Sequence, residues 1–289
     1  MHNKRDIQQE LNTLRGLGDI IGAYEEIAAM RMRKVKKSVL QNRYFVQGLN
    51  DIYFRVLYTY EKYLKKRKGR KGAKEEKLQT NGKTVSVLIT ANTGLYGDIV
   101  RKTYDLFINN TEEANTDLVI IGRVGRQLYE SRKRPKKYEY FEISDSGVDS
   151  QNTKMILEAI LVYTNIVVYH GQFVSVLDQE AVRTYVTGKA LDAKQASEAE
   201  LQELKCIIEP SMEEVASFFE KQILSSIFEH SVYESSLSKF ASRMITLDIA
   251  SENISELIKK TDFKMLKLKH RDASTKQSER LAGITLWSN

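Results

Sequence analysis

Proline is scarce in this sequence, which has only Pro135 and Pro210 among its 289 residues. A chain of average composition would carry about 5% proline, or roughly fourteen residues at this length. Proline interrupts helices because it lacks a backbone donor and clashes with the preceding turn. The stretches 1–134 and 211–289 therefore hold no strong helix breaker, and very long helices are permitted at both ends.

Cysteine and long apolar runs are scarce as well. Cys206 has no possible partner in the chain, so a disulfide-stapled secreted scaffold is excluded. The apolar runs, such as 118–121 and 166–169, fall far short of the roughly 18 residues that a membrane-spanning helix needs. No secretory or transit segment precedes the first patterned stretch, and we expect the chain to work in the cytoplasm.

Patterns typical of catalysis are also missing. There is no GxxxxGK[ST] phosphate cradle, and the four histidines lack HExxH or Cys/His spacing. Gly16-x-Gly18-x-x-x-Gly22 misses the dinucleotide fingerprint by one residue and does not follow a strand. We therefore predict no catalytic residue, no bound cofactor and no metal ligand.

The positive charge is concentrated in one segment. Residues 62–77 hold nine Lys/Arg and two Glu, a net charge of +7 that equals the excess of the whole chain. Nucleic-acid binders usually spread basic residues along a folded face among aromatics, whereas this glycine-interrupted run carries only Tyr63. We interpret 65–77 as a solvated basic loop that could touch an acidic partner or an anionic surface, and we predict no nucleic-acid partner.

The N-terminal part has the apolar spacing of a coiled-coil helix. Steps of three and four residues alternate along one predicted seam, and a similar pattern resumes at Val46. Four glycines in this stretch could mark close backbone approach or local bending. The seam residues are Ile7, Leu11, Leu14, Leu17, Ile21, Tyr24, Ala28, Met32, Val35 and Val39.

The C-terminal part mirrors the N-terminal one. Ser211 follows Glu209-Pro210 as a plausible helix N-cap, and an apolar stripe continues from Met212 to Leu257. Each long helix needs a partner, and the simplest partner is the other one. We predict an antiparallel coiled coil of helices 1–64 and 209–289.

The middle of the chain changes its period. Short runs rich in β-branched residues predict strands at 84–90, 117–121, 138–143, 165–169, 173–177 and 204–208. Helical stretches at 98–109, 125–134 and 152–164 alternate with them. This alternation predicts a Rossmann-like α/β domain with a small mixed sheet over 78–208. The predicted fold class is thus α/β plus a long antiparallel coiled-coil shaft.

One local feature stands out, the turn formed by Gly94, Leu95 and Gly97 between the first strand and the first helix. Ligands of α/β sheets usually bind at such turns, so it could hold a phosphate or a partner. We favour a structural turn whose glycines relieve backbone strain.

Six segments of the chain match, in order, the motifs of a known family: Ala23–Lys34, Thr90–Gly97, Val119–Arg123, Val168–Ser175, Glu209–Ser211 and Ser242–Ile258. In that order they resemble the N-terminal helix, the ITS..GLCG turn, the VIG.K and VYN.F.S segments, the EPS helix start and the A.RM.AMD.AT.NA.ELI run of one family. This family is the gamma subunit, the central rotor, of F-type ATP synthases.

The resemblance implies a non-catalytic shaft, one copy inside a hexamer of alpha/beta-type nucleotide-binding subunits, whose rotation couples their ATP sites to torque. The α/β domain would contact an epsilon-like subunit and, in a full synthase, a membrane ring. The complex would lie on the cytoplasmic side, peripheral to the inner face of the cell membrane. The hexamer contacts implied by the resemblance are Met30, Arg31, Arg33, Lys34, Lys269, His270 and Glu279.

The chain departs from the family pattern where the rotor meets the hexamer. Lys269 and His270 stand where the family has Arg and Gln, and Gly22 replaces a lysine. Lysine does not reproduce the bidentate fork of arginine. These departures favour a specialised, hydrolysis-driven F-like motor over a housekeeping synthase, which stays open as the alternative.

Two other classes of function remain. A non-catalytic coiled-coil scaffold could use the basic loop to hold an acidic partner, and it would not bring down a hexameric ATPase. An α/β enzyme using the turn at Gly94–Gly97 would bind a small molecule, although no nucleophile or acid–base group accompanies that turn.

Overall fold

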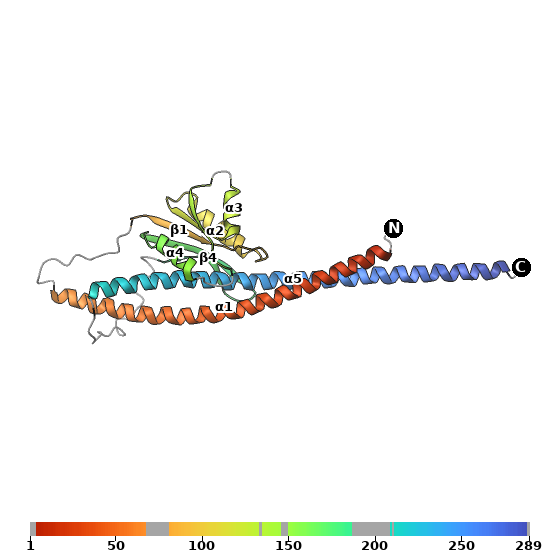
Figure 1. Ribbon diagram of the computed structural model, residues 1–289, viewed down its shortest axis with the longest axis horizontal. Helices are drawn as coiled ribbons and strands as arrows, with labels where there is room; N and C mark the ends of the chain where they lie inside the picture. The colour runs from red at the N-terminus through yellow and green to blue at the C-terminus, as the bar shows by residue number, and fades with distance from the viewer. Residues whose placement is uncertain are drawn as a thin grey trace. The chain divides into compact units, whose positions relative to one another are not determined.

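The structure is a computed structural model that describes residues 4–67, 81–132, 135–145, 150–186, 209 and 211–287. Its two longest helices are α1 (Lys4–Arg67) and α5 (Met212–Trp287) (Figure 1). The chain divides into two compact units. One combines Met1–Ala29 with Met244–Asn289, and the other comprises Met30–Arg243.

The first unit consists of the beginning of α1 and the later part of α5. Ile7 and Leu11 form a buried cluster with Met265. Farther along α1, the Arg15 guanidinium lies 3.7 Å from the Asp262 carboxylate. Residue numbers rise on α1 while they fall on α5, so the two helices are antiparallel here.

The helical part of the second unit is antiparallel as well. Val35 and Val39 are buried in one cluster with Leu237 and Phe240. Arg43 lies next along α1 and pairs at 3.4 Å with Glu234, which precedes Leu237 on α5. The predicted antiparallel pairing of the two chain ends is therefore confirmed within each unit.

The predicted seam is wrong at Leu17 and Tyr24, which are 45% and 48% exposed. The helix turns Gly18 rather than Leu17 toward α5, and an added Cβ at Gly18 would lie 3.7 Å from Ile254 Cγ2. A glycine in the seam keeps the contact close without contributing an apolar side chain. The hydrophobic pattern therefore misassigned the neighbouring leucine to the interface.

The sheet of the second unit has five strands in the order β3-β2-β1-β4-β5. All neighbours are parallel except β4 and β5, which form an antiparallel pair, so the predicted mixed sheet is confirmed. The strands are β1 (Thr84–Ile89), β2 (Asp117–Ile121), β3 (Tyr138–Phe141), β4 (Asn165–Phe173) and β5 (Gln179–Tyr185). The helices of this domain are α2 (Ile99–Thr111), α3 (Arg123–Glu130) and α4 (Ser150–Ile160).

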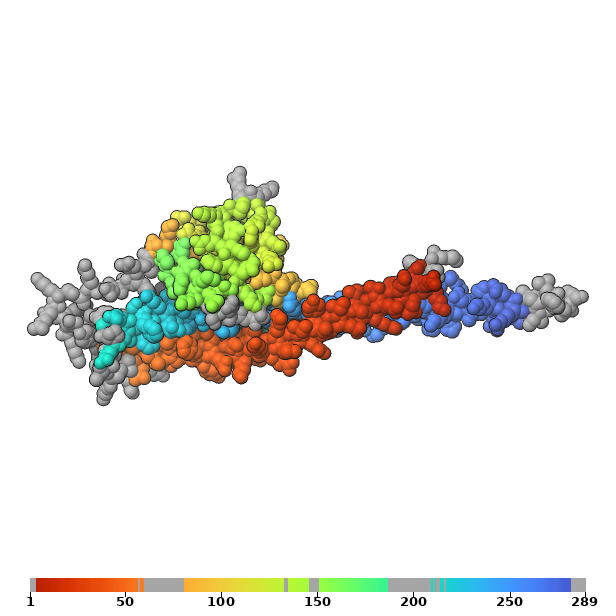
Figure 2. Space-filling view, viewed as in Figure 1, coloured from red at the N-terminus to blue at the C-terminus, as the bar shows by residue number. Residues whose placement is uncertain are grey.

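Both faces of the sheet are covered, which explains why its strands are nearly continuous apolar runs. On one face, Val85 and Val87 belong to a core with Ile156 of α4 and Phe228 of α5. On the other face, α2 and α3 supply the partners of residues such as Leu88. The shaft helix α5 is thus one of the layers of the sheet domain. Figure 2 shows the green surface of the domain lying directly on the cyan part of α5.

The strand predicted at 173–177 is wrong. Phe173 ends β4, residues 174–178 form the connecting turn, and β5 begins only at Gln179. The apolar residues that suggested a strand lie at the tip of a hairpin, where Leu177 is 84% exposed.

The predicted basic loop 65–77 begins too early, because residues 65–67 are still helical. The rest of that loop, the strand predicted at 204–208 and Cys206 lie outside the described residues. No helix in the described part of the chain combines the length and apolarity needed to cross a membrane.

Gly171 of β4 lies close against α5. An added Cβ would lie 2.3 Å from Ser238 Oγ and 2.9 Å from Ile99 Cγ1. We expect Gly171→Ala to lower the free energy of unfolding by about 1–3 kcal/mol through overpacking, measured by urea unfolding. Adding Ser238→Ala should restore part of the loss.

Gly48→Ala in α1 is the control, because nothing lies within 4 Å of its added Cβ. If the free energy of unfolding of Gly171→Ala were as high as that of Gly48→Ala, the close approach of Gly171 to α5 would be contradicted.

Candidate functional site: the junction between α5 and the sheet

Buried titratable side chains are the groups of this domain that could carry chemistry. Within the described ranges, no three His, Cys, Asp or Glu side chains are grouped to hold a metal ion. His170 lies in β4, with Nε2 2.9 Å from Thr184 Oγ1 and Nδ1 3.1 Å from the Gly171 carbonyl oxygen. Burial lowers the pKa of His170 to about 4, so the ring is neutral near pH 7 and serves the packing of the sheet.

The turn after β1 is tied to the neighbouring strand. Thr90 Oγ1 donates a 2.6 Å hydrogen bond to the Ile121 carbonyl and accepts one from the Gly125 amide. Leu95 has a φ of 64° and Gly97 a φ of 57°. Leu95 is therefore held in a left-handed conformation that a non-glycine residue rarely adopts. Gly94 has no neighbour within 4 Å of an added Cβ.

Asp145, from the segment after β3, accepts a set of hydrogen bonds from this turn. Its carboxylate receives the backbone amides of Asn92 and Thr93 at 3.0 and 3.1 Å, and the Thr93 hydroxyl at 3.2 Å. Burial alone would raise the pKa of Asp145. The attraction of Lys239 and these hydrogen bonds outweigh burial and hold the pKa below its ordinary value.

Lys239 of α5 is the cation that faces Asp145. Its side chain is 7% exposed, and its Nζ donates to Asp145 Oδ1 at 3.0 Å and to the Thr90 carbonyl at 2.9 Å. Burial lowers the pKa of Lys239, and the Asp145 carboxylate opposes that change. The pair therefore stabilises two charges that neither residue could keep alone at this depth.

Arg243 lies four residues farther along α5 and binds the tip of the segment that follows β1. Its guanidinium donates to the carbonyls of Gly94 and Leu95 at 2.6 and 3.2 Å, and it lies 3.9 Å from the centroid of the Tyr96 ring. Lys239 and Arg243 are four residues apart, so they project from the same side of the helix. We call these two residues the α5 clamp.

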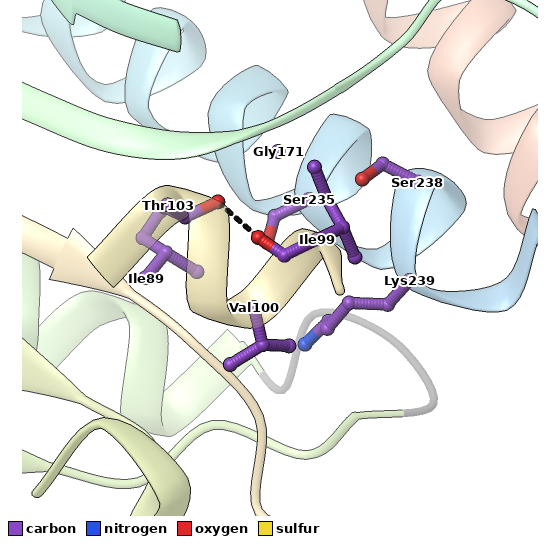
Figure 3. A pocket seen from close by; sticks show the side chains of 8 residues that line it. All are labelled: Ile89, Ile99, Val100, Thr103, Gly171, Ser235, Ser238 and Lys239. Atoms are coloured by element: carbon purple, nitrogen blue, oxygen red, sulfur yellow. Dashed lines mark hydrogen bonds between the residues drawn. The ribbon is translucent and has the colours of Figure 1, made fainter. Parts of the chain in front are cut away.

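The α5 clamp lies where α/β domains normally bind ligands. The chain leaves β1 toward β2 on one side, and β4 lies on the other, so the topological switch point is between β1 and β4. Figure 3 shows the small cavity beside it, lined by α2 residues such as Ile99 and α5 residues such as Ser238 and Lys239. Its volume of about 10 Å³ suits one water molecule at most. Helix α5 thus fills the place of a ligand.

The structure places the predicted hexamer-contact residues on the surface. Met30 is 63% exposed on α1, and Arg31, Arg33 and Lys34 are exposed beside it. Lys269, His270 and Glu279 are exposed on α5 and belong to the other compact unit. Within each helix the residues are therefore available to a partner.

The sequence did not reveal Asp145 or Lys239 as a site. A lysine between Leu237 and Phe240 in an apolar stripe was the only hint, because a charge in such a position needs a buried partner. Asp145 lies in a segment with no periodic pattern, so nothing in the sequence linked it to α5.

Comparisons with known proteins agree with this architecture. A family model described as ATP synthase matches residues 3–273. The chain is similar to the ATP synthase gamma chain of Desulfitobacterium hafniense, with 23% identity over 300 residues and 99% of each chain covered. It is also similar to that of Halothermothrix orenii, with 26% identity over 270 residues and 90% of each covered. Among solved structures, its fold is similar to a chain of the central stalk and c-ring of the Tetrahymena thermophila mitochondrial ATP synthase, with a TM-score of 0.54, 19% identity, and 80% of this chain and 99% of that chain covered.

Removal of the Lys239 charge tests the buried pair. We expect Lys239→Met to lower the free energy of unfolding by about 3–5 kcal/mol near neutral pH, because Asp145 is left buried and unpaired. The loss should shrink on acidification. In the natural chain, the contribution of Asp145 to the free energy of unfolding is lost as the pH falls through its lowered pKa, which lies below the ordinary value of about 3.9. In the variant, the unpaired Asp145 carboxylate becomes protonated at a higher pH.

The measurement is urea unfolding across a pH series. Lys102→Met is the matched control, because Lys102 forms an exposed ion pair with Asp98 at 2.8 Å in the same domain. An equally small loss for both lysine variants at neutral pH would show that the Lys239–Asp145 pair does not stabilise the junction.

Proposed function

We propose, because the chain belongs to the gamma-subunit family of ATP synthases, that it is the central rotor shaft of an F-type or F-like ATPase. One observation carries the proposal: the two ends of the chain pair as antiparallel helices, and one of them is fastened to the sheet domain. A shaft of this kind carries no active site of its own. It is a non-catalytic subunit of a complex that hydrolyses or synthesises ATP.

The exposed side of α1 supports a partner that surrounds the shaft. Within the first unit, Leu17, Ile20, Tyr24 and Ile27 are all more than 40% exposed and recur at three- and four-residue steps. A contiguous exposed apolar stripe of this kind marks an interaction surface. A hexamer of alpha/beta-type subunits, with one shaft per hexamer, would cover it.

The other partners follow from membership of the family. The sheet domain would contact an epsilon-like subunit and, in a full synthase, a membrane ring. The shaft would then work on the cytoplasmic side, peripheral to the inner face of the membrane.

The altered contact residues favour a motor driven by hydrolysis. Lys269 and His270 are exposed on α5, where the family pattern has Arg and Gln. A lysine ammonium is a compact point charge and cannot form the two parallel hydrogen bonds of a guanidinium. The contacts between shaft and hexamer would therefore be weaker than in a housekeeping synthase when the shaft is driven in the direction of ATP synthesis.

Rotation of a single complex tests the shaft directly. The complex is purified from native cells through a tag on the chain, and the hexamer is fixed to a surface. A bead is attached to Glu113→Cys, an exposed position of the sheet domain, in a Cys206→Ser background that removes the only native thiol of this chain. We expect one chain per hexamer and rotation of the bead in one direction on addition of ATP.

Two outcomes would contradict the proposal. Recovery of the chain without a hexameric ATPase would favour the coiled-coil scaffold, and a bead that stays still while the same hexamers hydrolyse ATP would exclude a rotating shaft.

Replacement of a housekeeping gamma subunit tests the direction of use. We expect the natural chain to support ATP hydrolysis but not proton-driven ATP synthesis, and the double variant K269R/H270Q to gain synthesis. Both residues are exposed, so the double variant should unfold within about 0.5 kcal/mol of the natural chain. Full synthesis by the natural chain would show that the hydrolysis-driven assignment is wrong.

A further inference from the structure

We propose that the α5 clamp, Lys239 and Arg243, is the mechanical joint that transmits torque between the shaft helix and the sheet domain. The inference rests on the proposed rotor function and adds the residues through which the load passes. Both side chains reach from α5 into the segment that follows β1.

Two kinds of contact hold α5 against the sheet domain: apolar packing and directional hydrogen bonds. Most of the contact between α5 and the sheet is apolar, through Leu224, Phe228 and Val232. The hydrophobic effect is non-directional, and its free energy follows the area removed from water rather than one alignment of atoms. Hydrogen bonds weaken steeply once distance and angle are lost. The α5 clamp therefore adds a direction-dependent resistance to rotation and sliding of α5.

The acceptors of the α5 clamp are connected to the centre of the sheet. Lys239 binds the Thr90 carbonyl, one residue beyond the end of β1, which is the middle strand. The Thr90 backbone amide and side-chain hydroxyl both donate to Ile121 at the end of β2. A force on Lys239 is therefore passed to two paired strands rather than to a loose loop.

The second attachment point is a turn held in a strained conformation. Leu95 keeps a φ of 64°, and Arg243 donates to its carbonyl and to that of Gly94. Strained backbone persists only where surrounding contacts hold it, and such strain clusters at functional sites. Asp145 also supports this turn, through the amides of Asn92 and Thr93.

The packing around the α5 clamp brings the donors within reach of backbone acceptors. This stretch of α5 is rich in buried serines: Ser231, Ser235, Ser236, Ser238 and Ser242. Gly171 of β4 has no Cβ, and this leaves room for the Ser238 side chain. Small side chains on both sides let the helix lie close to the strand ends, so that Lys239 can reach Thr90 directly.

The test uses the bead on Glu113→Cys described above and measures its angular fluctuation while the rotor pauses between steps. The variants are Lys239→Met and Arg243→Met, with Lys102→Met as the matched control. Each clamp variant removes one of the two polar attachments between α5 and the sheet domain, so we expect the variance of the bead angle to rise above that of the natural chain and of the Lys102→Met control. We also expect the bead to slip under viscous load, so that fewer turns are completed per ATP hydrolysed.

Each outcome decides a separate point. If Lys239→Met does not assemble, Arg243→Met decides, because its side chain is partly exposed and leaves no buried charge unpaired. Clamp variants with the angular variance and the turns per ATP of the control would overturn the joint. A natural chain whose bead fails to rotate would overturn the rotor function itself, which the clamp variants do not test.

Discussion

One buried ion pair, between Lys239 on α5 and Asp145 on the sheet domain, joins the shaft helix to the strand ends of the sheet. A cation at this depth is tolerated only if a carboxylate and further hydrogen-bond acceptors meet it. That requirement fixes the rotation of α5 about its own axis as well as its distance from β1. The apolar core supplies most of the driving force for assembly, and the ion pair adds a directional contact to it.

Helix α5 occupies the position at which α/β domains usually bind ligands. Parallel sheets of this topology leave a crevice at the switch point, between β1 and β4, where other proteins bind nucleotides. In this chain the Lys239 side chain and the small residues around Ser238 fill the crevice. A cavity of about 10 Å³ remains beside them. The architecture that elsewhere holds a ligand holds a helix of the same chain.

Much of the fold could be predicted because its signals are local. Two prolines, apolar residues at coiled-coil steps and short β-branched runs were sufficient for the two long helices and the mixed sheet. Errors arose where a residue acts through its neighbours in space. Leu17 matches the helical period, but Gly18 faces the partner helix; Leu177 matches a strand, but it lies at a hairpin tip. The Lys239–Asp145 pair joins residues 94 positions apart, and no local pattern relates them.

The antiparallel pairing of the chain ends has a consequence for synthesis on the ribosome. The partners of Ile7 and Leu11 include Met265, so the first helix emerges long before the residues that cover its apolar side. At translation rates of about 5–20 residues per second, this delay is on the order of tens of seconds. During that time the nascent helix presents an uncovered hydrophobic surface, which is the kind of segment that chaperones bind. These contacts of the first helix form only after residue 265 has been made.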